Sequence, residues 1–293
     1  MKLNESLRKP AWLKKKIEHS EESREVNRIL GRLELHTVCR SARCPNLSEC
    51  YSSRRATFLV LGNRCTRSCS FCSVEKSVPG VSLGLDEGEP TRVAEAVKEL
   101  GLRYAVITSV TRDDLPDGGA GHFVKTIEEI RRQNPDVKIE VLTPDFQGKE
   151  TAIRAVAETS PDVYNHNVET VPRLYRIVRP GADYGRSVNL LSFVHTHFPN
   201  IFLKSGLMVG LGEGEEEVQT LLRDLHAAGC DAVTIGQYLR PGHGNIPVKE
   251  YVTIEKFDRY RVFARKIGFR HVAAGPYVRS SYMAHELYRD LSS

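Results

Sequence analysis

The sequence contains no long hydrophobic run. None of its apolar stretches approaches the roughly 20 residues that a membrane-spanning helix needs. The first 23 residues mix Lys with Glu and lack both an apolar core and a small-residue cleavage site, which argues against a secretory signal. Their acidic residues also argue against an organelle transit peptide. We therefore expect a cytoplasmic protein without a membrane partner.

A long block of Lys and Arg is also absent. The chain has 42 Lys and Arg against 37 Asp and Glu, so its formal net charge is only +5. No basic stretch alternates with aromatic residues in the way that is typical of nucleic-acid-binding segments. We therefore expect no nucleic-acid partner, and we interpret the small positive charge as a margin of solubility. A composition of 40% hydrophobic and 27% charged residues is that of a globular protein.

Cysteine is what the sequence does contain in an unusual pattern. Six of the seven cysteines fall between Cys39 and Cys72. Because no export signal is present and cytosolic thiols are kept reduced, a disulfide framework is not expected. Clustered cysteines in such a chain indicate metal binding or redox chemistry.

The hydrophobic pattern predicts an α/β fold. Six short apolar runs are each followed by an amphipathic stretch; they begin at Ala56, Tyr104, Lys138, Asp162, Ile201 and Asp231. Strands that alternate with helices indicate a parallel sheet with right-handed crossovers. The pattern alone fits a barrel, a partial barrel or an open doubly wound sheet. We divide the chain into an N-terminal extension (1–55), the strand–helix region (56–270) and a C-terminal extension (271–293).

Polar residues gather where the predicted strands end. In α/β proteins this edge of the sheet is where ligands bind, although strand ends also lie near solvent for purely structural reasons. Five ends that carry amide, hydroxyl and charged groups favour a site. The residues concerned are Thr108, Ser109, Thr143, Asp145, Asn165 to Glu169, Lys204, Ser205, Gln237 and Arg240.

Three cysteines directly follow the first predicted strand. The run CTRSCSFC spaces them as Cys65-x3-Cys69-x2-Cys72; we call them the second triad. Three thiolates can hold three irons of a [4Fe–4S] cube and leave the fourth iron open to a small molecule. The alternative is a zinc knuckle, but structural zinc requires four closed ligands and no fourth ligand lies nearby in the sequence.

The second triad, with Phe71 before its last cysteine, resembles the signature of the radical S-adenosylmethionine (SAM) superfamily. The resemblance implies a full or partial (β/α) barrel, with the triad in the loop after the first strand. It also implies that the open iron binds SAM and that electron transfer splits SAM to release a 5′-deoxyadenosyl radical. Asp117-Gly118-Gly119 resembles the loop that receives the SAM amino group in this superfamily, and its glycines would let the backbone approach a ligand.

Three further cysteines precede the first strand with a different spacing. Cys39-x4-Cys44-x5-Cys50, here called the first triad, lies in the N-terminal extension. Its spacing alone leaves structural zinc or a stabilising cluster open. Together with VRSSYMA near the C-terminus, the two triads resemble the lipoyl synthase family. Further stretches that carry this resemblance are TSVTRDDLPDGGA, PDVYNHNVETV, VRPGADYGRS, KSGLMVGLGE and TIGQYLRP.

The resemblance implies two [4Fe–4S] clusters and a sulfur-insertion reaction. The second triad would hold the catalytic cluster, and the first triad would hold an auxiliary cluster together with a serine of the RSSY motif. We assign that serine to Ser280, with Ser281 as the alternative. Serine is a hard ligand for iron, so its bond to the cluster should be labile. The implied fold is a partial (β/α)6 barrel whose extensions carry the auxiliary cluster.

The implied substrate is an octanoyl chain on a lysine of a carrier protein. The carriers of the family are lipoyl domains of 2-oxoacid dehydrogenase E2 subunits and the glycine cleavage H protein. The family replaces C–H by C–S at C6 and then at C8, using one SAM for each step and sulfur from the auxiliary cluster. An electron donor such as ferredoxin or flavodoxin is implied, and a protein that rebuilds the cluster is a further possible partner.

Several polar residues are candidates for SAM contacts, and each could instead form a salt bridge or a helix cap. Three other residues have their own interpretation. His166 is expected to pack or hydrogen-bond because the chemistry is homolytic, Cys230 to be a small core residue, and Trp12 to pack on the barrel or help dock the carrier. The SAM candidates are Thr108, Ser109, Asn165, Asn167, Glu169, Arg179, Lys204, Gln237 and Arg240.

Two other functions compete with sulfur insertion of this kind. One is another sulfur-transferring radical SAM enzyme, similar to biotin synthase or to a methylthiotransferase. Such an enzyme should lack the combination of paired triads and RSSY. The other is a binding module in which the cysteines hold zinc. Iron and zinc content would separate this last possibility from the enzymes.

Overall fold

The computed structural model describes residues 7–15, 20–78, 83–286 and 288. An eight-stranded sheet runs through it in the order β1-β2-β5-β6-β7-β8-β9-β10. β1 pairs with β2 in antiparallel fashion, and each later pair in this order is parallel. The strands are β1 (His36–Thr37), β2 (Thr57–Val60), β5 (Tyr104–Ser109), β6 (Lys138–Leu142), β7 (Val163–Asn165), β8 (Phe202–Val209), β9 (Ala232–Gln237) and β10 (His271–Gly275).

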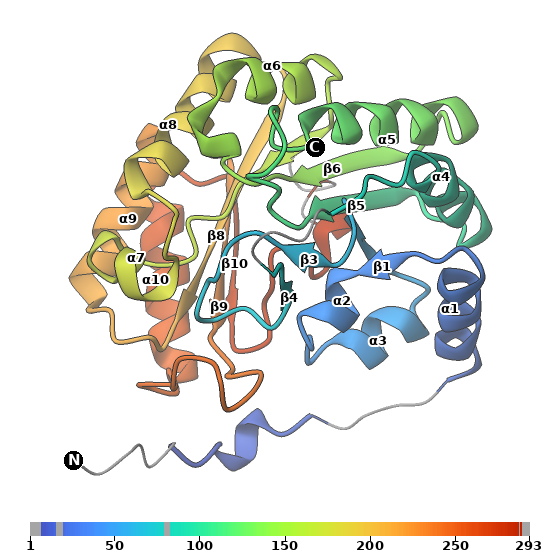
Figure 1. Cartoon of the computed structure of the whole chain (residues 1–293). Coiled ribbons are helices and arrows are strands. Elements are labelled where there is room, and N and C mark those ends of the chain that lie inside the picture. Colours follow the sequence, from blue (N-terminus) through green and yellow to red (C-terminus); the bar gives the residue numbers. More distant parts are fainter. Residues whose placement is uncertain (1–6, 16–19, 79–82, 287, 289–293) are drawn as a thin grey trace.

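Helices follow the strands and lie outside the sheet (Figure 1). Successive helices pack against each other from α4 to α10, which gives the curved arrangement of a partial barrel. The larger ones are α4 (Glu89–Glu99), α5 (Ala120–Gln133), α6 (Glu150–Glu158), α8 (Tyr184–His197), α9 (Glu215–Ala227) and α10 (Ile254–Ile267). The shorter ones in this region are η2 (Phe146–Gly148), η3 (Pro172–Leu174) and α7 (Tyr175–Val178).

The six expected strands are confirmed, and the partial-barrel prediction with them. The amphipathic patterns also hold: α5 buries Phe123, Ile127 and Ile130 as one stripe. The structure adds a parallel strand, β10, that was not among the six. The expected boundary at residue 270 thus falls immediately before a strand of the sheet.

The N-terminal extension forms a small helical layer beside β1 and β2 (Figure 1). It consists of η1 (Ala11–Leu13), α1 (Glu21–Arg32), α2 (Val38–Ser41) and α3 (Leu47–Ser52). Helix α1 begins after its N-cap Ser20, which accepts a hydrogen bond from the amide of Ser23. This layer brings the first triad against the start of the sheet.

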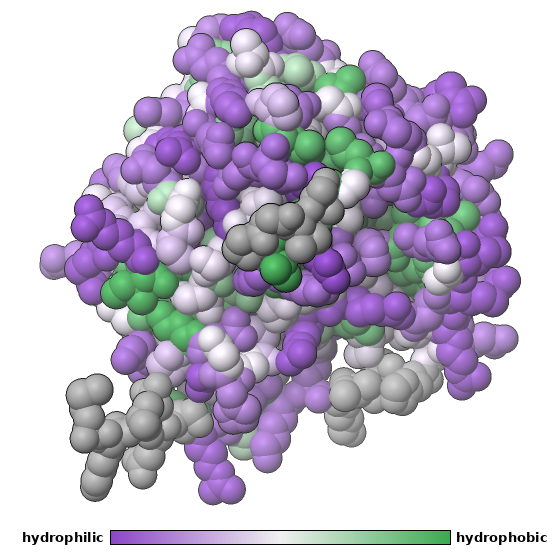
Figure 2. Space-filling view, in the orientation of Figure 1, coloured by the Kyte–Doolittle hydropathy of each residue, from purple (hydrophilic) through white to green (hydrophobic). Residues whose placement is uncertain are grey.

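The face of the molecule in Figure 2 is mostly hydrophilic, with small and separate hydrophobic areas. The helices that the structure describes include none with the length and apolar character needed to cross a bilayer.

Candidate active site

The second triad lies in the loop that follows β2, at the carboxyl end of the parallel strands. Cys65 ends the short strand β3 (Arg64–Cys65), which pairs with β4 (Glu75–Lys76). The amide of Ser77 donates to the carbonyl of Cys65 at 2.8 Å, and the amide of Cys72 donates to the carbonyl of Cys69 at 3.2 Å. Phe71 packs against the hydrophobic core. Backbone bonds therefore fold the loop so that three partly exposed thiols share one short turn.

Arg67, inside the triad, fastens this loop to the sheet. Its guanidinium donates to both carboxylate oxygens of Asp113 at 2.7 and 3.0 Å and to Asp145 Oδ1 at 2.5 Å. Asp113 and Asp145 follow β5 and β6, so one buried side chain ties three loops together. Although burial acts to raise the pKa of Asp145, Arg67 lowers it to about 2. Asp145 is therefore a structural carboxylate rather than a free site group.

Asn245 also holds the second triad, and the sequence analysis did not identify it. Its Nδ2 donates to the carbonyls of Ser70 at 3.2 Å and Cys72 at 3.0 Å. The amide of Ile246 donates to Ser70 at 3.0 Å. The only sequence signal was its place in the Gly- and Pro-containing loop after the sixth predicted strand.

Three predicted residues lie together beside the cysteine loop. The amide of Ser70 donates to the carbonyl of Val178 at 3.0 Å, which places the end of α7 against that loop. The neighbouring Arg179 donates to the carbonyl of Asn167 at 3.0 Å, and Asn167 Nδ2 donates to Glu169 Oε1 at 3.0 Å. Burial raises the pKa of Glu169, and its φ of 65° is a left-handed conformation rare for this residue type. We call these three residues the Arg179 group.

The residues of the Asp117-Gly118-Gly119 turn contact other parts of the chain. Both carboxylate oxygens of Asp117 are used at the start of α5, where they accept from the amides of Gly119 at 2.9 Å and Gly121 at 2.8 Å. Gly119 has a φ of 90°, and a Cβ there would lie 2.3 Å from Leu61. The close approach seen here is thus to the chain itself, and the SAM contact stays a prediction.

Two of the predicted SAM residues hold backbone instead. Gln237 donates to the carbonyl of Glu250 at 2.9 Å and accepts from the amide of Val252 at 2.8 Å. Arg240 Nε donates to the carbonyl of Asn245 at 2.7 Å, within its own loop. Both side chains therefore form structural hydrogen bonds to the backbone, which was the alternative to a contact with SAM.

The interior of the sheet carries a buried polar network. Lys204 Nζ lies 2.9 and 3.1 Å from the two carboxylate oxygens of Glu140, and both side chains are fully buried. Asn165 Nδ2 donates to the same carboxylate at 2.8 Å, and Thr108 donates to a backbone carbonyl. Lys204 therefore forms a buried ion pair with Glu140. By contrast, Asn165 Oδ1 and Ser109 Oγ are buried without a partner among the described residues, so they stay available to a ligand.

His166 is a buried neutral ring, as expected of a packing residue. Its Nδ1 lies 2.9 Å from the carbonyl of Thr143 and its Nε2 lies 3.0 Å from Ser187 Oγ. A carbonyl can only accept, so Nδ1 carries a proton. The hydroxyl of Ser187 lies within hydrogen-bond distance of both Nε2 and the carbonyl of Asp183, at 3.0 and 3.1 Å. Burial lowers the pKa of His166 from 6.5 to about 4.

This lowered pKa predicts a pH-dependent component of stability. Between pH 4 and 6.5 the unfolded chain binds a proton at His166 that the folded chain does not bind. The stabilisation is complete above pH 6.5 and is lost as the pH falls through 4. The free energy of unfolding, measured with urea, should therefore rise more steeply with pH in the parent than in His166→Gln. Between pH 5 and 7.5 we expect the rise in the parent to be larger by about 2 kcal/mol. Parallel profiles would show that the ring titrates normally.

The first triad is held by the two short helices of the N-terminal layer. Cys39 lies in α2 and Cys50 in α3, with Cys44 in the turn between them. Thr37 caps α2 by accepting from the amide of Arg40 at 3.3 Å, and the amide of Cys44 donates to the carbonyl of Cys39 at 3.0 Å. The turn brings the three cysteines to one side, facing a cavity.

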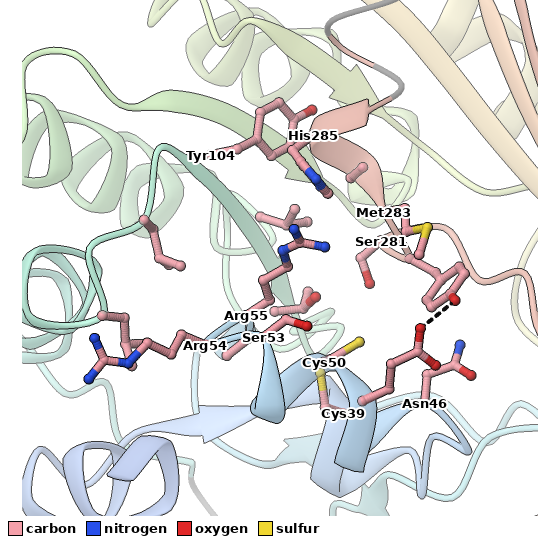
Figure 3. A pocket seen from close by; sticks show the side chains of 18 of the residues that line it. Cys39, Asn46, Cys50, Ser53, Arg54, Arg55, Tyr104, Ser281, Met283 and His285 are labelled. Atoms are coloured by element: carbon pink, nitrogen blue, oxygen red, sulfur yellow. Dashed lines mark hydrogen bonds between the residues drawn. The ribbon is translucent and has the colours of Figure 1, made fainter. Parts of the chain in front are cut away.

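This cavity, which we call the triad cavity, has a volume of about 510 Å³. Its walls come from the first triad, the starts of β2 and β5, and the C-terminal segment, so parts far apart in the sequence meet there (Figure 3). Exposed Arg54, Arg55 and Arg103 contribute positive charge to its lining. The residues that Figure 3 labels include Cys39, Cys50, Ser281, Met283 and His285.

The two serines of the RSSY segment (residues 279–282) face different surroundings. Ser281 lines the triad cavity with the first triad. Ser280 is not part of that lining; its Oγ donates to Asn167 Oδ1 at 2.6 Å. This geometry favours the alternative, Ser281, over Ser280 for the auxiliary-cluster role, and the choice between them stays a prediction.

The donors around the triad cavity fit an iron–sulfur cluster. Burial raises the pKa of Cys39 to about 11 and that of Cys50 to about 12, so their thiolates require a compensating cation. Three thiols and a hydroxyl on one cavity wall are a donor set that suits iron. Within the described residues, no group of three or more His, Cys, Asp or Glu side chains is arranged to hold a single metal ion.

Two remaining predictions concern single residues. Cys230 is confirmed as a core residue, 3% exposed within the main hydrophobic cluster. Trp12 is 46% exposed, while its neighbour Leu13 is fully buried. The short helix η1, which contains both residues, therefore packs through Leu13 rather than through Trp12.

Comparison with known proteins finds relatives that match nearly the whole chain. The sequence profile of the Radical SAM superfamily matches residues 59–225, more than half of the chain. Lipoyl synthase of Caldanaerobacter subterraneus is 59% identical over 279 residues, which cover 95% of this chain and 96% of that protein. Lipoyl synthase of Rubrobacter xylanophilus is 52% identical over 96% of this chain and 87% of that protein.

Solved structures are similar in fold. Methylornithine synthase superposes with a TM-score of 0.53 at 15% identity, over 90% of this chain and 85% of that one. HydG, a maturase of the [FeFe]-hydrogenase, gives a TM-score of 0.54 at 14% identity, over 92% and 74%. At these identities the likeness concerns the architecture alone. The full-length relatives and the superfamily match together show that this chain belongs to the lipoyl synthase family of radical SAM enzymes.

Proposed function

We propose that this chain inserts sulfur at C6 and C8 of an octanoyl group on a carrier-protein lysine and so produces the lipoyl group. The observation that carries the proposal is the pairing of two cysteine triads on different elements, with the RSSY segment beside the first. Relatives that match over nearly the whole chain support the same activity.

The second triad would hold a [4Fe–4S] cluster with one iron open to SAM, and the first triad with Ser281 would hold the auxiliary cluster. When bound, the first of these clusters would supply the electron that cleaves SAM and so leads to removal of an unactivated hydrogen, and the auxiliary cluster would supply the sulfur that replaces it. Neither an acid nor a base among the side chains could remove such a hydrogen. The chain's own side chains therefore position the reacting groups and exclude water from them.

Positioning falls to residues that hold the cysteine loop. Arg67 fixes the loop to the ends of β5 and β6, and Asn245 fixes it to the loop after β9. Asn165 Oδ1 and Ser109 Oγ, buried without partners among the described residues, are the acceptors and donors best suited to a polar ligand. Such a preorganised arrangement restricts where a reactive species could act.

The carrier would be a lipoyl domain of a 2-oxoacid dehydrogenase or the glycine cleavage H protein. An electron donor such as ferredoxin or flavodoxin, and a protein that rebuilds the auxiliary cluster, complete the proposed set of partners. The family supports these partners, and the cytoplasm is the location in which all of them would meet the enzyme.

An anaerobic assay tests the proposal directly. The reconstituted chain is incubated with SAM, a reductant and an octanoyl-lysine peptide, and products are followed by mass spectrometry. We expect 5′-deoxyadenosine and a peptide that carries two sulfur atoms. A product with sulfur at one carbon only, or a methylthiolated product, would favour the other sulfur-transferring enzymes; stoichiometric zinc in place of about eight irons would favour a binding module.

Replacing the two serines of the RSSY segment separately tests which one serves the auxiliary cluster. In Ser281→Ala the triad cavity loses the hydroxyl of Ser281, and we expect up to about four irons to be lost during anaerobic gel filtration. Ser280→Ala should retain the parent's iron content, because its hydroxyl faces Asn167. Iron counting and Mössbauer spectra provide the measurement. Loss of iron from Ser280→Ala alone would restore the original assignment.

A further inference from the structure

The RSSY segment is set into the sheet at glycines. A Cβ at Gly206 of β8 would lie 2.8 Å from Ser280 Oγ, and one at Gly236 of β9 would lie 2.2 Å from the carbonyl of Val278. At Gly236 the close atom belongs to the backbone, so any larger residue there would displace the segment, whereas at Gly206 a Cβ would meet the side chains of Thr234, Asn167 and Ser280. The backbone of β8 and β9 thus gives the segment a defined seat.

Within this seat Ser280 makes a short hydrogen bond. Its Oγ donates to Asn167 Oδ1 at 2.6 Å and lies 3.5 Å from Thr234 Oγ1. Asn167 has no freedom to follow a moving partner, since its Nδ2 is used by Glu169 and its carbonyl by Arg179. The bond therefore joins the C-terminal segment to a fixed point of the sheet.

That fixed point adjoins the second triad. Arg179 follows Val178, whose carbonyl accepts from the amide of Ser70 in the cysteine loop. Ser280 is thus hydrogen-bonded to Asn167 of the Arg179 group, which lies against the loop of the second triad. Ser281 instead lines the triad cavity with the first triad.

We propose that Ser280 is a positioning residue, whose bond to Asn167 sets the register of Ser281 and the auxiliary site relative to the second triad. The inference rests on the proposed function, because it concerns alignment of the two cluster sites. Consecutive Cα atoms are about 3.8 Å apart, so a shift of Ser280 moves Ser281 by a similar amount. Misplacement on the scale of 1 Å is enough to impair a reaction that depends on geometry.

The first arm of the test measures anchoring. Hydrogen exchange of the peptide spanning 276–286 is compared in anaerobically reconstituted parent, Ser280→Ala, Ser280→Thr and Asn167→Ala. We expect Ser280→Ala and Asn167→Ala each to raise the exchange rate about fivefold, the double variant to add little, and Ser280→Thr to stay near the parent. Parent-like exchange in both alanine variants would overturn the proposal.

The second arm separates positioning from cluster binding. Ser280→Ala should keep the parent's iron content yet form roughly fivefold more 5′-deoxyadenosine per sulfur inserted. An unchanged ratio, or loss of iron as in Ser281→Ala, would overturn the positioning role. If the parent itself inserts no sulfur, the proposed function fails, whereas the exchange data still decide whether Ser280 anchors the segment.

Discussion

Cys65→Ala is expected to abolish SAM cleavage, whereas Cys44→Ala is expected to cleave SAM within about tenfold of the parent rate and to insert no sulfur. The reason is the separation of the two triads. Cys65 lies in the loop after β2, and Cys44 lies in the helical layer that faces the triad cavity. Each substitution removes a thiol from one site and leaves the other site's elements in place. Production of 5′-deoxyadenosine and of sulfur-bearing peptide under anaerobic conditions measures the two activities.

Cys230→Ala is the matched control for both variants. It also removes one thiol, but from the hydrophobic core and away from both triads. Its SAM cleavage and sulfur insertion should equal those of the parent once the folded fraction is taken into account. Sulfur insertion at normal yield by Cys44→Ala would contradict the division of labour between the triads, and SAM cleavage by Cys65→Ala would contradict the assignment of the second triad.

The strands and the cysteine sites were predictable because their signals are local. Apolar runs alternate with amphipathic stretches, so all six expected strands and helix α5 follow from periodicity. The two triads are likewise read from spacing within short segments. β10 was missed because HVAAG is short, contains two alanines and a glycine, and has little of the β-branched character typical of strands.

Side-chain partners across the sheet were not predictable in the same way. Lys204 was expected at a strand end but lies near the start of β8, where it pairs with Glu140. Gln237 does end β9, but it binds the backbone near residue 250. The choice between Ser280 and Ser281 depends on which way a turn presents two identical neighbours, and no composition or spacing encodes that direction. These outcomes depend on tertiary contacts between distant segments.

Lys204→Met is expected to cause the largest loss of stability among single substitutions outside the triads. Glu140 would then be a fully buried carboxylate without its cation, keeping only the hydrogen bonds from Asn165 and Tyr104 at 2.8 and 2.7 Å. Removing one partner of a buried ion pair costs about 3–5 kcal/mol. In a chain of this size this lowers the melting temperature by roughly 10 °C, as circular dichroism would measure.

Two further variants show whether the loss arises from the unpaired charge. Lys125→Met removes a lysine from an exposed pair with Glu87 and should cost less than about 1 kcal/mol. The double variant Glu140→Gln/Lys204→Met contains no charge at this position; its amide oxygen can still accept from Asn165, and its NH2 group can donate to the hydroxyl of Tyr104. It should therefore be more stable than Lys204→Met alone, because the desolvated carboxylate is gone. If the double variant were the less stable of the two, the unpaired carboxylate of Glu140 would not be the cause of the loss.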